Sequence, residues 1–371
     1  MIKGGLRMTV AACLLTTAFA VTATAETRTY YIAVDEVDWD YAPTGINRIT
    51  GRPFGVSDPP YTTTVFVERG KDRIGRVYRK ARYREYTDGT FSTIKSIPPE
   101  WEHLGILGPV IRAEVGDTIR VIFKNNARFP FSVHPHGVFY TKDSEGAPYD
   151  DGTSGAEKKD DAVPPGGTHT YIWLVPERAG PGPNDPSSIL WMYHSHTDES
   201  RDTNTGLIGP MIISARGTTK GDGTPKDVDR EFVTLFTIFD ENVSFYLDHN
   251  IKMYTGRPAT VERDEEEFIE SNLMHTINGL IFGNVSGLTM KRGERVRWYM
   301  MGLGNEVDLH TPHWHGQTLL LHGSRTDMVD LLPAMMKTME MVPDNPGTWL
   351  FHCHVNDHLD GGMVALFTVT P

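Results

Sequence analysis

Cysteine is scarce in this sequence, which has two, Cys13 and Cys353, in 371 residues. Cys13 falls within residues 1–25, where two basic residues precede a short apolar run and a small-residue cleavage pattern. This arrangement predicts an export signal that is removed before Glu26. The remaining chain then has Cys353 alone, which excludes an internal disulfide. A lone thiol in an oxidising compartment needs another role, and metal binding is a suitable one.

Basic residues and long apolar segments are also few. Lysine and arginine number 36 against 48 aspartate and glutamate residues, a net charge of −12, and loss of the positive charges of Lys3 and Arg7 with the signal makes it −14. Such an acidic surface argues against nucleic-acid binding and favours cations as partners. The N-terminal apolar run is too short to span a membrane, and no later segment is apolar enough. We therefore expect a periplasmic or secreted protein without a membrane span.

The rest of the chain consists of two similar halves. Residues 108–137 and 287–316 each contain a glycine–acid turn, an alternating apolar strand and a His-x-His motif. A second His-x-His follows in each half, before a closing apolar strand. Glycine and proline are plentiful and spread out, as in turn-rich β proteins. The sequence predicts an all-β protein of two antiparallel β-sandwich domains, residues 26–216 and 225–371, with little helix beyond a short helical or loop insertion near residues 262–269.

Histidine is concentrated in four clusters. Ten of the 15 histidines belong to them: His134 and His136; His194 and His196; His310, His313 and His315; His352, His354 and His358. Alternate residues of a strand share a face, so each His-x-His can offer two imidazoles to one metal site. Any single pair could be an ordinary hydrogen-bonded core or surface feature. Four clusters at matching places in two halves indicate metal binding.

The last cluster carries the most specific signal. Its pattern is His352-Cys353-His354-x3-His358-x4-Met363. A thiolate, two imidazoles and a weak axial thioether form the ligand set of a blue copper site. Cys353, His358 and Met363 supply three of these ligands, and His310 is the candidate for the second imidazole. The other eight histidines match the number that a three-copper cluster requires.

These motifs resemble the multicopper oxidase family. The resemblance implies four coppers per chain and the coupling of one-electron oxidation of a reductant to four-electron reduction of O2 to water. Type 1 copper would be held by His310, Cys353, His358 and Met363. Type 2 copper would be held by His134 and His313. The type 3 pair would be held by His136, His194, His196, His315, His352 and His354.

The first half departs from the second at one informative position. Ser195 stands where the second half has Cys353, so we expect no type 1 copper in the first domain. This resembles two-domain laccases with type 1 copper in the second domain. The resemblance implies cupredoxin-like Greek-key domains in a homotrimer, a ring of six domains with each cluster between neighbouring chains. Gln317 also departs from many members, which have histidine there.

Residues 30–43, 68–88, 267–284 and 302–311 resemble ceruloplasmin-like ferroxidases in particular. That resemblance implies an Fe(II) oxidation site made by Glu270, His275 and Asp357, with Glu306 from a neighbouring chain. The carboxylates would suit iron. The alternative is structural: Glu306 and Asp357 could orient type 1 ligands, Glu270 could belong to a solvated acidic run, and His275 could be a core histidine. Phenols are the other candidate reductants.

Three further interpretations are weaker. A methionine group, at Met335, Met336, Met339 and Met341, suggests either core filling or a soft cuprous-ion site. A copper nitrite reductase-like trimer needs a thiolate in the first domain, where this sequence has Ser195. A non-catalytic copper-binding relative would not need ligands for four coppers.

Overall fold

The computed structural model describes residues 24–55 and 63–371, together with Met1. The predicted export signal, residues 1–25, therefore lies outside the described residues except at its two ends. Within the described residues no helix is long and apolar enough to cross a membrane.

The first half of the chain forms two four-stranded sheets. One has the strand order β4-β1-β6-β8, with bounds Val77–Tyr86, Thr27–Asp40, Thr118–Asn125 and Thr168–Leu174. The other has the order β5-β10-β9-β7, with bounds Ile111–Glu114, Ile208–Ser214, Ser188–His194 and His134–Pro135. Their facing side chains share one apolar core, for example Val121 of β6 and Ile213 of β10. In β6 alternate residues Ile119, Val121 and Phe123 are fully buried, which is the period of a strand with one face on a core.

The second half repeats this plan. A six-stranded sheet has the order β12-β11-β14-β18-β16-β17, with bounds Leu273–Ile277, Arg230–Asp240, Val296–Gly302, Met336–Met341, Leu319–Leu321 and Ser324–Thr326. A four-stranded sheet has the order β13-β20-β19-β15, with bounds Thr289–Lys291, Val364–Thr370, Gly347–Cys353 and Pro312–Trp314. The orders β4-β1-β6-β8 and β12-β11-β14-β18 correspond strand for strand. So do β5-β10-β9-β7 and β13-β20-β19-β15, which confirms two copies of one β unit.

The expectation of antiparallel sandwiches holds for most strand pairs but not for all of them. Each of the four large sheets contains one parallel pair: β1 with β6, β5 with β10, β11 with β14, and β13 with β20. The two strands of each pair are far apart in sequence, and a long connection of that kind allows parallel pairing. Turn signals report local hairpins and carry no information on such crossovers.

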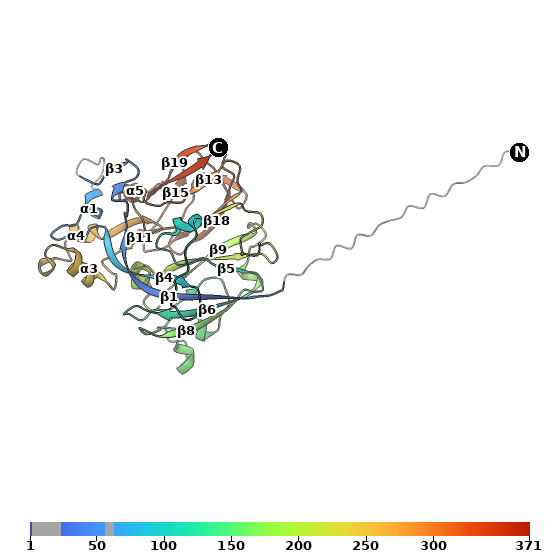
Figure 1. The fold of residues 1–371 in the computed structure, drawn as a ribbon, viewed down its shortest axis with the longest axis horizontal. Coiled ribbons are helices and arrows are strands. Elements are labelled where there is room, and N and C mark those ends of the chain that lie inside the picture. The colour runs from blue at the N-terminus through green and yellow to red at the C-terminus, as the bar shows by residue number, and fades with distance from the viewer. Residues whose placement is uncertain (2–23, 56–62) are drawn as a thin grey trace.

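Short helices and a small hairpin lie outside the sheets. The hairpin joins β2 (Ile46–Asn47) to β3 (Arg52–Pro53). The α-helices are α1 (Thr63–Val67), α2 (Glu199–Thr205), α3 (Leu247–Tyr254), α4 (Glu266–Ser271) and α5 (Asn356–Asp360). The 3-10 helices are η1 (Pro99–Leu104), η2 (Lys142–Ser144), η3 (Gly155–Lys158), η4 (Glu177–Ala179) and η5 (Pro258–Thr260). Helices α1, α3 and α4 gather on one side of the molecule (Figure 1). Helix α4 overlaps the insertion expected near residues 262–269.

A third core joins the two halves. Along β11, Phe232 and Phe236 face the core of the second half, whereas Val233 and Leu235 face a core that includes Ile208 of the first half. Burial on both faces explains why β11 and β14 are apolar along most of their length instead of alternating apolar with polar residues. Each buried side chain of this size contributes about 1.5–3 kcal/mol. The halves, blue to green and yellow to red in Figure 1, therefore form one packed unit.

A buried ion pair crosses the same interface. Lys80 on β4 donates to the carboxylate of Glu241, which follows β11, and both side chains are fully buried. Lys80 Nζ also donates to the Asn204 carbonyl at 2.7 Å and lies 4.4 Å from the centre of the Phe239 ring. The pair joins the first half to the second with a charged contact that water does not reach.

Candidate metal centres

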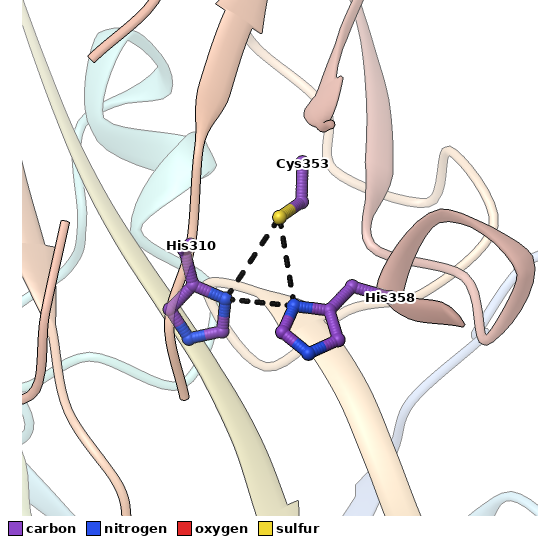
Figure 2. A group of neighbouring side chains, drawn as sticks. All are labelled: His310, Cys353 and His358. Carbon is purple, nitrogen blue, oxygen red and sulfur yellow. Dashed lines mark hydrogen bonds between the residues drawn. The ribbon is translucent and has the colours of Figure 1, made fainter. Parts of the chain in front are cut away.

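Three side chains of the second half converge in its core, and one of them, His310, is distant in sequence from the other two. Cys353 Sγ lies 3.5 Å from His358 Nδ1 and 4.0 Å from His310 Nδ1, and the two Nδ1 atoms are 3.1 Å apart. Figure 2 shows the sulfur facing both imidazole nitrogens. Cys353 ends β19, His358 lies on α5, and all three residues are buried. This is the arrangement of donors expected for a blue copper site.

The protonation state of this group suits a metal. Burial alone raises the pKa of the Cys353 thiol, but hydrogen bonds from His310 and His358 outweigh it and lower the pKa to about 6. Near neutral pH the thiolate is therefore the main form, and the thiolate is the form that binds metals.

Neighbouring groups hold these ligands in place. Asp308, a buried residue that the sequence analysis missed, lies 3.1 Å from His310 Nε2 and accepts the Ile238 backbone N–H at 2.7 Å. With Nε2 engaged, Nδ1 of His310 is left to face Cys353. Asp308 stands two residues before His310, a spacing that could have revealed it.

Met363 lies next to the same group. Its side chain is fully buried, and its backbone N–H donates to the His358 carbonyl at 2.9 Å. Its carbonyl accepts the Cys353 backbone N–H at 3.1 Å. The backbone thus places Met363 against both neighbouring ligand candidates.

The remaining histidines of the second half form one quartet: His313, His315, His352 and His354. Strands β15 and β19 pair with His313 opposite His352, so their rings meet. Nε2 of His315 and Nε2 of His352 lie 3.0 Å apart. The Nδ1 atoms of His313 and His352 lie 3.0 and 2.7 Å from the carbonyls of Asp327 and Cys353. Anchored on that side, both rings present Nε2 to the shared space.

The first half holds an equivalent quartet: His134, His136, His194 and His196. Strands β7 and β9 pair His134 with His194, and Nε2 of His136 lies 3.0 Å from Nε2 of His194. Burial, followed by the charges of neighbouring histidines, lowers the pKa of His136 to about 4 and of His194 to about 3. Both rings are therefore neutral at pH 7, the form that binds a metal.

Each quartet also depends on a glycine. Gly137 and Gly316, directly after the two His-x-His motifs, have φ of +77° and +66°. A Cβ at Gly137 would lie 2.3 Å from the Trp191 ring, and one at Gly316 would lie 3.0 Å from Trp349. The turn after each motif therefore requires both the left-handed backbone and the missing side chain.

Two acidic residues near the first quartet escaped the sequence analysis. Asp202 Oδ2 accepts the Ser195 hydroxyl at 2.6 Å, so Ser195 is committed to a buried hydrogen bond. Glu199 Oε2 lies 3.1 Å from His196 Nε2. This contact with His196, against the opposing effect of burial, lowers the pKa of Glu199 to about 2 and keeps it ionised.

The two quartets do not meet within one chain. Across residues 24–55 and 63–371, the ring contacts and hydrogen bonds of each quartet connect its own members and its own half. Within one chain, therefore, the eight histidines form two separate groups of four.

Three of the four residues predicted for an iron site lie together beside His358. The His275 ring is 5.6 Å from the His358 ring and 5.6 Å from the Phe66 ring. Burial, and then the nearness of His358, lowers the pKa of His275 to about 4. Glu270 keeps solvent access, but partial loss of water and the charge of nearby Asp357 raise its pKa.

His275 also has a ring nitrogen that makes no hydrogen bond within the described residues. The residue is 7% exposed, and the unpaired nitrogen is Nδ1. A Cβ at Gly361 would lie 2.4 Å from this nitrogen, so the glycine leaves room for the ring. A buried ring nitrogen without a partner is unusual for a purely structural histidine.

Glu306 and Gln317 lie outside the group of contacts around His275. Glu306 is exposed and, within the described residues, makes no hydrogen bond or ion pair with Glu270, His275 or Asp357. Gln317 is buried and hydrogen-bonds to the 344–345 loop, donating to the Asn345 carbonyl at 2.8 Å.

The methionine group lies in or against the cores. Met339 and Met341 are buried in a core, and Met335 and Met336 pack against cores, which favours the core-filling interpretation.

Comparisons with known proteins show which family the chain is similar to. Two family models, each described as multicopper oxidase, match residues 104–218 and 257–371. Ferroxidase HEPHL1 of Homo sapiens is 49% identical over 344 residues, 92% of this chain and 29% of the relative. Ceruloplasmin of Homo sapiens is 45% identical over 345 residues, 92% of this chain and 30% of the relative. The chain thus spans under a third of these relatives' length.

Solved structures share the fold. A structure described as a multicopper oxidase aligns with a TM-score of 0.56 at 18% identity, over 93% of this chain and 89% of that chain. Blue copper oxidase from Nitrosomonas europaea aligns with a TM-score of 0.58 at 18% identity, over 92% and 86%. These neighbours show a cupredoxin-like, mostly β architecture. With a family model matched in each half, the chain belongs to the multicopper oxidase family.

Proposed function

We propose that this chain is an exported copper-dependent oxidase that takes single electrons from a reductant and reduces O2 to water. The observation that carries the proposal is the buried group of His310, Cys353 and His358, whose donor atoms lie within 4.8 Å of one another. Two imidazoles and a thiolate fit copper in number, type and protonation state. Bound copper would supply one-electron chemistry at this site and four-electron chemistry towards O2 in the cluster.

The proposed copper ligands divide into the buried group around Cys353 and the two histidine quartets. His310, Cys353, His358 and Met363 form the type 1 set. His134 and His313 form the type 2 set. The type 3 set is His136, His194, His196, His315, His352 and His354. Cys353 is joined through the backbone to His352 and His354, so the type 1 set and half of the cluster set are neighbours in the chain. This is the coupling that the proposed reaction needs.

We further propose that the cluster is completed between chains. Each domain, residues 26–216 or 225–371, contributes one quartet, and each quartet is flanked by exposed apolar side chains. Phe139 and Leu174 are 49% and 48% exposed near the first, and Leu309 and Met328 are 52% and 38% exposed near the second. Large exposed apolar side chains are typical of an interface. A head-to-tail contact that closes on itself gives a ring, here a homotrimer.

Mixing two chain variants tests this arrangement. One variant carries His136→Asn and the other His315→Asn, so neither can build a complete cluster alone. In equal mixtures refolded together, a wild-type first quartet meets a wild-type second quartet at half times half, or about a quarter, of the interfaces. We expect about a quarter of wild-type oxygen consumption from the mixture and almost none from either variant. A mixture as inactive as its parts would contradict the head-to-tail cluster.

We propose Fe(II) as the reductant. Support comes from the approach of Glu270 and Asp357, the unpaired Nδ1 of His275 and the contact of that ring with the type 1 candidate His358. The name of one relative, Ferroxidase HEPHL1, agrees with this assignment. Carboxylate oxygens bind hard iron ions, favour the ferric product and so ease loss of the electron.

The test compares two reductants in one assay. Oxygen consumption is measured with ferrous iron and with a phenol, in wild type and in Glu270→Ala. We expect the iron kcat/KM to fall on the order of tenfold and the phenol value to stay near wild type. Glu267→Ala removes an equal charge from the same helix and is the matched control. If both rates fall alike, Glu270 supports the copper site and phenols remain the candidate reductants.

A further inference from the structure

A large cavity lies away from the candidate metal centres. Its volume is about 790 Å³, and it opens beside β4, where β1, the 94–110 segment and residues 222–224 meet. None of the candidate copper ligands lines it. Its apolar wall consists of Ile94, Ile97, Trp101, Leu104 and Val110. The volume lies in the range typical of small-molecule sites, about 300–1,000 Å³.

One cation in this cavity lacks a counter-ion. Arg82 Nη2 and Nε donate to the same Leu107 carbonyl, at 3.1 and 3.4 Å, and the guanidinium lies 5.8 Å from the centre of the Trp39 ring. Within the described residues, its Nη1 has no partner and no carboxylate pairs with it. Burial, and then the positive charge of Arg84, lowers the pKa of Arg82 to about 10. Burial and the neighbouring Arg84 thus disfavour the positive charge of Arg82, and no negative charge among the described residues balances it.

Arg82 is the exception among the cations that line the cavity. The other four have carboxylate partners: Arg28 with Asp117 at 2.6 Å, Lys95 with Glu85 at 2.8 Å, Arg112 with Glu231 at 2.8 Å and Arg84 with Asp35 at 3.9 Å. The cavity carries five cations against three carboxylates, Glu85, Glu100 and Asp222. Glu85 is already paired, and Glu100 and Asp222 are exposed. The balance near Arg82 is positive.

We infer that this cavity binds a small organic anion, a carboxylate with an apolar tail or ring, with the Arg82 guanidinium as its charge partner. An arginine fork can give a carboxylate two parallel N–H donors, and the free Nη1 is available for this contact. The apolar wall then covers the tail. A free inorganic anion would leave that wall exposed, so an amphipathic ligand fits better.

The same ligand would steady the contact between the halves. Trp101 lies on η1, its ring 5.4 Å from that of His103, and His103 Nε2 accepts the Val233 N–H of β11 at 3.0 Å. A molecule against Trp101 therefore rests on an element that joins both halves. Because such a ligand binds the folded state alone, it raises the melting temperature.

The experiment titrates the copper-loaded chain with decanoate, which has no group that the oxidase reaction consumes, and with decanol as its uncharged equivalent. Calorimetry measures affinity, and thermal unfolding measures the stabilisation. We expect decanoate to bind and decanol to bind at least tenfold more weakly. Arg82→Gln should weaken decanoate about tenfold or more, the worth of one charged hydrogen-bond pair.

Two variants keep the result interpretable. Arg295→Gln removes an exposed arginine that pairs with Asp229 and does not line the cavity, so decanoate affinity should not change. Ile97→Glu places a negative charge at a cavity position that is 51% exposed, so the fold should tolerate it while decanoate binding weakens. Equal affinity for decanol and decanoate, or unchanged binding in both Arg82→Gln and Ile97→Glu, would overturn the inference.

Discussion

His310 Nδ1 and His358 Nδ1 lie 3.1 Å apart although the residues are 48 positions apart in sequence. Two nitrogen atoms at this distance both face Cys353 Sγ, and both rings are buried. The fold thus brings together two imidazole rings that would repel each other if both were protonated and positively charged. This relationship is the basis for the first two predictions.

Replacing the thiol should abolish the blue colour. Cys353→Ser keeps the shape of the side chain but loses the sulfur donor, so the intense charge-transfer absorption of a copper thiolate should disappear. Visible absorption of the copper-loaded variant measures this. Ser195→Ala, at the equivalent position of the first half, should leave the absorption in place. A Cys353→Ser protein that stays blue would rule out the type 1 assignment.

Asp308 should be needed to hold His310. Asp308→Asn weakens the contact to His310 Nε2 that leaves Nδ1 free, and loss of such outer contacts typically costs about 10- to 100-fold in metal affinity. Competition with a copper chelator, read from the blue absorption, measures the change. Asp330→Asn removes an exposed aspartate that pairs with Lys337 and serves as the control. Equal copper retention in both variants would mean that Asp308 only supports the backbone of β11.

Removal of the buried lysine at the interface should be strongly destabilising. Lys80→Met leaves Glu241 buried without its partner, and breaking a buried pair on one side costs about 3–5 kcal/mol. Urea unfolding gives the free energy. Lys95→Met removes the exposed partner of Glu85 and should cost at most about 1 kcal/mol. A similar small loss for both variants would show that water reaches Glu241 readily.

His103 should make the fold sensitive to acid. Burial, and then the positive charge of Arg230, against the contact with the Glu100 carbonyl, lowers its pKa to about 4 from 6.5. The folded state therefore binds fewer protons than the unfolded state below pH 6.5. The stability that neutral His103 provides is complete above pH 6.5 and is lost as the pH falls towards 4. Between pH 7 and pH 4.5 the free energy of unfolding should fall by about 2.5 kcal/mol for this reason.

The measurement compares urea unfolding at pH 7 and pH 4.5 in wild type and in His103→Gln. Glutamine can accept from Val233 and donate to Glu100 but does not take up a proton, so the pH-dependent loss should shrink by about 2.5 kcal/mol. Copper release at low pH affects both proteins and cancels in the difference. His169→Gln is the control, because His169 is less buried, and should keep the wild-type loss. An unchanged loss in His103→Gln would contradict the assignment.

Much of the architecture follows from patterns within short segments. Alternating burial in strands such as β6 and the repeated His-x-His motifs predict sheets, two halves and two quartets. The pattern around Cys353 also places Cys353, His358 and Met363 near one another, because each is only a few residues from the next. These relationships are local, and local sequence is sufficient for them.

The other features that the sequence did not reveal depend on how segments are placed in three dimensions. Parallel pairing of β1 with β6 depends on how distant segments cross. The contact of Glu199 with His196, and of Asp202 with Ser195, depends on the direction in which α2 leaves β9. The uncompensated charge of Arg82 can be recognised only when all neighbours of its side chain are known. The placement of segments in three dimensions, rather than residue type, decides each of these.

Strand β11 limits what evolution or engineering can do with the repeat. If residues 225–371 were excised, Val233 and Leu235 would lose their partners from the first half, and an apolar face would meet solvent. Each copy relies on the other to cover an apolar face, although each contains its own pair of sheets. Gene fusion or domain-shuffling experiments must therefore move the two copies together, or redesign the face that they share.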